Sequence, residues 1–213
     1  MYAHAMGMEL KTVYQKDSPP KYIHESDQVF GLCVDIINAL NSRLREHNIR
    51  IVSIDNEMPF ARLRKHLELG EIDVFFGLTK NKEREKLYRY ANHLYEIYYT
   101  FAKLKLNPFE YTGEASLQDK LVGVLRGTNS AKIISRIQEV KVSKINTVPT
   151  ALKMLMLKRI DLVYYHNLGL EWNIKQSEYK NDLEIVNLKI SLQFTFFVSR
   201  NAHIFTSPLK SIP

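Results

Sequence analysis

The sequence predicts an α/β protein of two similar lobes, with mainly parallel sheets and helices on both faces. Short apolar strands alternate with amphipathic helices in the order β-α-β-α-β. The same order starts again near residue 121. In addition, Ile72-Asp73-Val74 and Ile160-Asp161-Leu162 both place Ile-Asp between a helix end and an apolar strand. Any α/β protein can contain such junctions, so the repeated motif supports two lobes only together with the repeated order.

The first half supplies three strands and two helices. We predict strands at residues 10–14, 49–54 and 73–76, and helices at 32–45 and after Pro59. The first helix carries one apolar stripe at three-to-four spacing, made by Leu32, Ile36, Ile37, Leu40 and Leu44. Pro59 suits the first turn of the second helix, where its missing N–H would have no partner, and Gly70 ends that helix. One face of each helix is therefore expected to cover a sheet.

The second half repeats this arrangement after a β-rich run at 97–104. We predict strands at 121–125, 142–145 and 161–165, and helices at 129–137 and 151–157. The economical architecture assigns residues 1–94 plus 192–213 to lobe 1 and 95–191 to lobe 2, with hinges near 94–97 and 191–194. Open α/β sheets bind ligands at the carboxyl ends of their strands, so we expect the ligand to lie there, between the lobes.

Length and composition exclude several classes of protein. The chain has 213 residues, of which 45% are hydrophobic and 25% charged, as in an ordinary globular protein. Its single cysteine, Cys33, rules out an intrachain disulfide and a Cys-rich zinc site. No apolar run approaches the roughly 20 residues of a membrane-spanning helix.

The charge is positive but dispersed. Thirty Lys and Arg against 23 Asp and Glu give a formal charge of +7 and a pI near 9.3. The basic residues are spread along the chain, and the cluster at 80–86 is diluted by Glu83 and Glu85. We therefore expect a solvated surface and no nucleic-acid partner, with a field that favours small anions or an acidic partner surface.

One segment has the chemistry to bind a carboxylate. A buried strand ends at Gly77, where the missing Cβ permits close approach, and Thr79 and Arg84 follow. A guanidinium presents a rigid fork of donors that matches both carboxylate oxygens. The plainer interpretation places Arg84 on a solvated helix beside Glu83 and Glu85, and local chemistry alone does not decide between the two.

A second anion site is predicted at residues 126–130, between a strand and a helix. Unpaired N–H groups and the positive end of the helix dipole favour an anion near Thr128. The segment lacks the Gly-Lys-Ser/Thr ending of a phosphate-binding loop. Plain capping of the helix by Thr128 or Asn129 is the alternative explanation.

Taken in order, these motifs resemble those of a known family. Gly31-Leu32-Cys33-Val34-Asp35, Gly70-Glu71-Ile72-Asp73, Gly77-Leu78-Thr79 with Glu83-Arg84, and Gly127-Thr128-Asn129-Ser130 are similar to motifs of the family 3 extracellular solute-binding proteins. These proteins are the periplasmic amino-acid-binding components of ABC transporters. The resemblance covers roughly residues 9–200 and implies a two-lobed clamshell of the periplasmic-binding-protein type II.

The resemblance also implies a set of ligand contacts. Arg84 would bind the ligand α-carboxylate, helped by Thr79 and by the backbone at Thr128, and Phe60 would pack over the ligand. The chain at 14–18 would line the side-chain pocket. The expected ligand-binding residues are Tyr14, Ser18, Phe60, Gly77, Thr79, Arg84, Thr128, Asn129 and His166.

The sequence departs from the family at His166. The family usually has an acidic residue five positions after the Asp that opens the second-lobe strand, and this acid pairs with the ligand ammonium group. Here Asp161 leads to His166, followed by Asn167. A neutral histidine accepts one hydrogen bond, and a protonated one would favour a second carboxylate. The ligand is therefore expected to be either an α-amino acid or a carboxylate or dicarboxylate without that amino group. For His166 itself, a role as a polar cap at the strand end explains the residue equally well.

Other function classes have less support. The histidines form no His-x-x-x-His pair, which argues against a zinc hydrolase. We expect no metal or other cofactor. A dehydratase-like enzyme acting on a small cyclic acid would need a cleft carboxylate such as Glu25 or Glu57, and nothing singles these out. A ligand-sensing input domain is the other alternative. We expect a monomeric, non-enzymatic protein that serves a transporter permease in the periplasm, and Ala3-His4-Ala5 fits the small-x-small pattern of a cleaved export signal.

Overall fold

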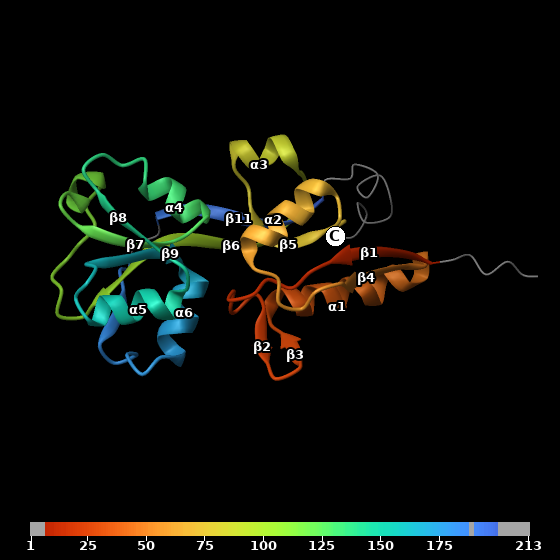
Figure 1. Ribbon diagram of the computed structural model, residues 1–213, viewed down its shortest axis with the longest axis horizontal. Helices are drawn as coiled ribbons and strands as arrows, with labels where there is room; N and C mark the ends of the chain where they lie inside the picture. The colour runs from red at the N-terminus through yellow and green to blue at the C-terminus, as the bar shows by residue number, and fades with distance from the viewer. Residues whose placement is uncertain (1–6, 188–189, 200–213) are drawn as a thin grey trace, which may run out of the picture. The chain divides into compact units, whose positions relative to one another are not determined.

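The computed structural model describes residues 7–187 and 190–199 and divides into two compact units (Figure 1). Unit 1 comprises the residues up to Glu96 and those from Phe194 onward, and unit 2 comprises Ile97–Gln193. The chain crosses the boundary inside two strands, β6 (Arg89–Leu104) and β11 (Ile190–Ser199). Unit 1 is therefore built from two separate stretches of the chain, whereas unit 2 is one continuous stretch.

Unit 1 combines strand pairs with three helices. Strands β1 (Met8–Thr12) and β4 (Ile49–Ser53) pair in parallel, and β5 (Phe75–Thr79) pairs antiparallel with β11. The helices are α1 (Leu32–Leu44), α2 (Phe60–Leu69) and α3 (Lys82–Leu87), with a 3₁₀ turn at Arg45–His47. A hairpin of β2 (Ile23–Glu25) and β3 (Gln28–Phe30) completes the unit.

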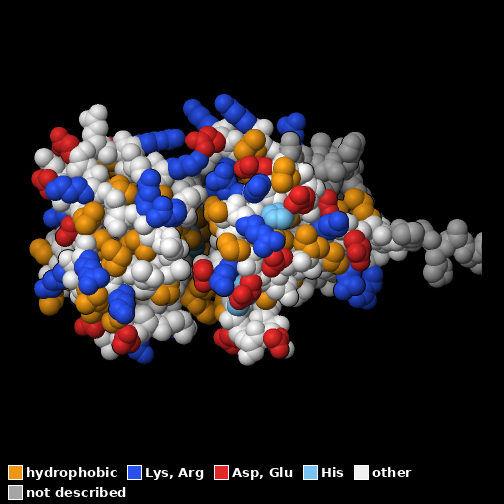
Figure 2. All heavy atoms as spheres, viewed as in Figure 1, with side chains coloured by type: hydrophobic (Ala, Val, Ile, Leu, Met, Phe, Trp, Pro, Cys, Tyr) orange, Lys and Arg blue, Asp and Glu red, His pale blue; other side chains and the backbone are white. Residues whose placement is uncertain are grey.

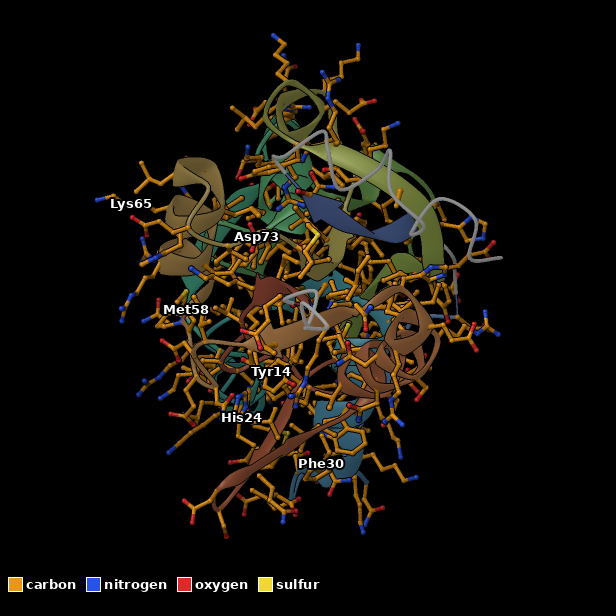
Figure 3. All side chains as sticks on the ribbon, turned by 90° about the vertical axis from the view of Figure 1, so that its right-hand side faces the viewer. Tyr14, His24, Phe30, Met58, Lys65 and Asp73 are labelled. Atoms are coloured by element: carbon orange, nitrogen blue, oxygen red, sulfur yellow. The ribbon has the colours of Figure 1, made fainter. Side chains whose placement is uncertain are left out.

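The core of unit 1 follows from the apolar faces of its helices. Ile37 and Leu44 of α1 and Leu63 and Leu67 of α2 are almost fully buried in one cluster with the strands. All five residues of β5 are buried, as expected for a strand covered on both faces. On the opposite side of α2, Lys65 projects away from the core (Figure 3).

Unit 2 has parallel β-α-β connections bordered by antiparallel strands. Strand β7 (Leu121–Leu125) pairs in parallel with β8 (Lys141–Ile145) and with β9 (Leu162–His166). Strand β6 pairs antiparallel with β9 and with β10 (Leu183–Ile185). The helices are α4 (Asn129–Ile134), α5 (Val148–Met156) and α6 (Asn167–Gln176), with a 3₁₀ turn at Glu114–Leu117.

Two cores lie on opposite faces of this sheet. Along β9, Leu162 and Tyr164 pack in one cluster, whereas Val163 and Tyr165 pack in another. This alternation is the two-residue period of a strand. Figure 1 shows α4 on one side of the strands of unit 2 and α5 and α6 on the other, as predicted for helices on both faces.

The structure differs from the sequence predictions at several element ends. The helix predicted at 129–137 ends at Ile134, where Ser135 N–H bonds to Ala131 O and turns follow. The β-rich run predicted from residue 97 extends back to Arg89. Helices α3 and α6 and the β2–β3 hairpin were not predicted, because they are short or lack a clear apolar period.

Two further observations concern the surface charge and the length of the helices. On the face that Figure 2 presents, Lys and Arg side chains are interspersed with Asp and Glu, and no continuous basic stripe is visible there. Within residues 7–187 and 190–199, none of the helices has the length and apolar character needed to cross a membrane.

Candidate functional site

Arg84 lies on α3, immediately after β5, and its side chain is buried. The side-chain oxygen of Asn81 caps this helix by accepting bonds from the backbone N–H groups of Glu83 and Arg84. Only 8% of Arg84 is exposed, whereas Glu83 and Glu85 on either side face solvent. The interpretation of Arg84 as a solvated helix residue is therefore wrong.

Thr79 holds the guanidinium of Arg84 in a fixed orientation. Nη1 of Arg84 donates to the backbone oxygen of Thr79 and to its Oγ1, and both distances are 2.8 Å. The Arg84 Cζ lies 5.8 Å from the centre of the Phe60 ring, within the range of a cation–π contact. The structure thus brings together three of the predicted residues, Phe60, Thr79 and Arg84, in unit 1.

Gly77 sits in the middle of β5 with a positive φ of 84°. A Cβ built on it would lie 3.0 Å from each of three side-chain atoms, in Lys21, Cys33 and Tyr95. Glycine is required here for two reasons, because the backbone conformation disfavours other residues and the space is filled. Its role is to let these three side chains approach the strand.

Lys21 is a buried cation that sequence reasoning missed. It is 9% exposed, and its Nζ donates to Oε1 of Gln15, which is also buried, at 3.2 Å. Burial lowers the pKa of Lys21 to about 8; the neighbouring Cys33 raises it and the charge of Arg84 lowers it further. The one sequence signal was its position, three residues beyond Ser18, which ends the segment expected to line the pocket.

The two residues of the 14–18 segment that were predicted to contact the ligand, Tyr14 and Ser18, lie in or against the core of unit 1. Tyr14 is half-buried and stacks on Tyr22, with 5.6 Å between ring centres. Its backbone oxygen accepts a hydrogen bond from Met58 N–H at 3.0 Å, and both residues are labelled in Figure 3. Burial raises the pKa of Tyr14. Ser18 is 3% exposed, and its Oγ has no hydrogen-bond partner within the described part of the chain.

In unit 2, Thr128 caps α4. Its Oγ1 accepts a bond from Ala131 N–H, donates to Leu125 O at 2.7 Å and contacts Ser130 Oγ at 2.8 Å. The next residue, Asn129, is buried and donates through Nδ2 to the Tyr99 hydroxyl at 3.4 Å. The predicted capping by Thr128 is therefore present, and any ligand contact there would use the backbone.

His166 is the N-cap of α6. Its Nδ1 accepts a bond from Gly169 N–H at 3.0 Å, which places the proton of a neutral ring on Nε2. The other ring nitrogen is then a donor and suits an anion better than an ammonium group. Because Tyr99 of β6 is directly opposite His166 of β9, the structure brings Tyr99, Asn129 and His166 to one region of unit 2.

Cys33, Glu25 and Glu57 are the residues on which the enzymatic alternatives would depend. Burial raises the pKa of the Cys33 thiol, so this cysteine is not an activated nucleophile. Glu57 is exposed and pairs with Lys16 at 3.5 Å, and Glu25 is exposed on β2. In the part of the chain that the structure describes, no group of three or more His, Cys, Asp or Glu side chains is placed to hold a metal ion.

Comparisons with known proteins bear on the family and the fold. The model of bacterial extracellular solute-binding proteins, family 3, matches residues 10–180. No curated protein sequence matches the chain. Among solved structures, holo ArgBP from T. maritima is 21% identical with a TM-score of 0.78, covering 95% of this chain and 93% of that one.

Two further structures show the same fold. The arginine-bound substrate-binding protein AbpA of an amino acid ABC transporter from Streptococcus pneumoniae is 15% identical with a TM-score of 0.79, covering 95% of this chain and 86% of that one. The GluR0 ligand-binding core in complex with L-glutamate is 18% identical with a TM-score of 0.78, covering 98% and 89%. At these identities the likeness concerns the fold.

Proposed function

Because the chain belongs to the family 3 bacterial extracellular solute-binding proteins, we propose that it binds a small, amino-acid-like ligand through the ligand's carboxylate. The observation that carries this proposal is the buried guanidinium of Arg84, held at 2.8 Å by two oxygens of Thr79. ArgBP, AbpA and the GluR0 core hold arginine or glutamate, which all bear an α-carboxylate.

The physical basis is the pairing of a restrained fork with a planar anion. A guanidinium has five N–H donors, and fixing its orientation in advance reduces the entropy lost when a ligand binds. Charge-assisted bonds are about twice as strong as neutral ones, and more so where water is excluded. The Phe60 ring beside the guanidinium offers an apolar surface for the carbon skeleton of the ligand.

We further propose that unit 2 contributes the backbone at Thr128 and the side chains of Asn129 and His166 to the same ligand. Contacts from both units would then stabilise the ligand-bound conformation over the ligand-free one. The size of this shift is set by the difference between the ligand's affinities for the two conformations. The binding protein would act in the periplasm as a monomer and deliver its ligand to a membrane permease. The substrate-binding role of AbpA in an amino acid ABC transporter supports the delivery role.

Calorimetry on three proteins tests the role of Arg84. A thermal-shift screen of amino acids and dicarboxylates first identifies a ligand for the wild-type protein. Arg84→Ala should then weaken its binding by on the order of 1.5–3 kcal/mol, through the loss of a charge-assisted bond. Arg89→Ala, which removes an exposed arginine of the same unit, is the control and should bind normally. Unchanged affinity in Arg84→Ala would overturn the proposal.

A further inference from the structure

Unit 1 buries two cations within range of each other. Among the residues that the structure describes, Lys21 and Arg84 are the charged side chains in the buried set, which contains no Asp or Glu. The charge of Arg84 acts on Lys21 and disfavours its protonated form. Burying like charges is costly unless an anion compensates them.

The chain fixes Lys21 in place. Its backbone oxygen accepts a bond from Cys33 N–H at 3.0 Å, which ties it to the first turn of α1. Its side-chain stem passes Gly77, where any Cβ would lie 3.0 Å from the Lys21 Cδ. Both the backbone and the stem of Lys21 are therefore held in place by neighbouring residues.

Among the residues that the structure describes, the groups that act on Lys21 do not neutralise it. Its Nζ donates to the amide oxygen of Gln15, which carries no net charge. The Cys33 thiol next to it is held protonated by burial, and the Cys33 Sγ lies 3.6 Å from the Tyr95 hydroxyl. Burial likewise keeps the hydroxyl of Tyr22 protonated by raising its pKa. The titratable neighbours are thus neutral or, in the case of Arg84, positive.

We propose that Lys21 binds a second anionic group of the ligand, so that the protein selects small dicarboxylates, including acidic amino acids, over neutral and cationic ones. This inference rests on the proposed function, in which Arg84 holds the first carboxylate. Lys21 is then a specificity-determining residue. The same charge disfavours arginine, the ligand of ArgBP and AbpA.

Matched ligands test this selectivity. L-Glutamate and L-glutamine have the same carbon skeleton, but glutamate has a second carboxylate where glutamine has a neutral amide. Glutarate has both carboxylates of glutamate and lacks its amino group. The wild-type protein should prefer glutamate or glutarate over glutamine and arginine by about tenfold or more. Lys21→Met keeps an unbranched stem without the charge, and it should lose the preference for the dianion while still binding through Arg84.

A second measurement needs no variant. Near pH 8 Lys21 is partly deprotonated, and an anion beside it would restore the proton. Calorimetry of the wild-type protein in two buffers of different ionisation enthalpy should show uptake of about half a proton with a dicarboxylate and none with glutamine.

The outcomes separate the two proposals. If glutamine or arginine binds as well as glutamate, or if Lys21→Met keeps the preference, the role of Lys21 is overturned and that of Arg84 stands. If Arg84→Ala binds every acid as the wild-type protein does, or if no acid in the panel binds, the proposed function fails and the role of Lys21 fails with it.

Discussion

Asp73 in unit 1 and Asp161 in unit 2 make the same pair of hydrogen bonds in their own sheets. The Asp73 carboxylate accepts from Lys11 N–H at 2.8 Å, and the backbone N–H of Asp73 donates to Lys11 O at 2.9 Å. The corresponding bonds of Asp161 join it to Leu121, at 2.7 and 2.9 Å. In both units, the aspartate of the Ile-Asp motif thus links the start of the strand that follows a helix to a neighbouring strand, β1 in unit 1 and β7 in unit 2.

Each aspartate should therefore protect one particular amide. Asp73→Ala should lower the free energy of unfolding by about 0.5–1.5 kcal/mol and speed hydrogen exchange at Lys11, and Asp161→Ala should do the same at Leu121. Amide exchange followed by NMR distinguishes the two sites. Equal acceleration at both amides in one variant would contradict local roles for the two carboxylates.

The last residues of two strands in unit 1 give a matched pair of threonines. Thr79 Oγ1 accepts a bond from Arg84, whereas Thr12 is fully buried and its Oγ1 lacks a partner within the described residues. Thr79→Val should cost about 1–3 kcal/mol of stability, because it leaves a buried charged donor with one acceptor fewer. Thr12→Val removes an unsatisfied hydroxyl and should be neutral or stabilising. Urea unfolding of both variants checks the difference.

Gly77 should be far less tolerant of substitution than Gly70. Both have positive φ, 84° and 76°, but a Cβ at Gly70 meets nothing within 4 Å, whereas at Gly77 it meets three side chains at 3.0 Å. Gly70→Ala should cost about 1 kcal/mol for the backbone alone, and Gly77→Ala should cost about 1–3 kcal/mol more through overpacking. Equal shifts in thermal denaturation would mean that Lys21, Cys33 and Tyr95 move aside freely.

The buried ammonium of Lys21 should make stability rise with pH. Burial lowers the pKa of Lys21 from 10.5 to about 8, so between these values the unfolded chain binds more protons than the folded one, and stability increases as the pH rises. The full difference corresponds to about 3 kcal/mol. Lys21→Met should be the more stable protein below pH 8, and this advantage should shrink between pH 8 and 10.5. A constant difference in chemical unfolding across this range would show that Lys21 does not titrate as a buried group.

The sequence predicted the buried strands of both units and helices α1, α2 and α5, because apolar periodicity is a local property. It left Arg84 undecided between a solvated and a ligand-binding position until the resemblance to the family was considered. It did not reveal Lys21, because lysines are mostly exposed and its burial depends on Gly77 and Cys33, which are distant in the chain. It also left the side chain of His166 undecided between ligand and cap. The bond from Gly169 N–H, three residues further along the chain, identifies His166 as a cap and explains why α6 forms in a segment without a clear apolar period.

His166 offers a way to test why the chain lacks the acid that its family usually has there. Aspartate is a better N-cap than histidine, so His166→Asp should keep the bond to Gly169 N–H and the fold of α6. The added charge should strengthen binding of L-glutamate relative to glutarate, which has no ammonium group, by about 1.5–3 kcal/mol if the side chain faces the ligand. His166→Asn caps equally well without the charge and is the control. Calorimetry with the two ligands should show the gain in glutamate affinity in His166→Asp alone. The same gain in His166→Asn would mean that capping, and not charge, is responsible. No gain in either variant would place the ammonium group elsewhere.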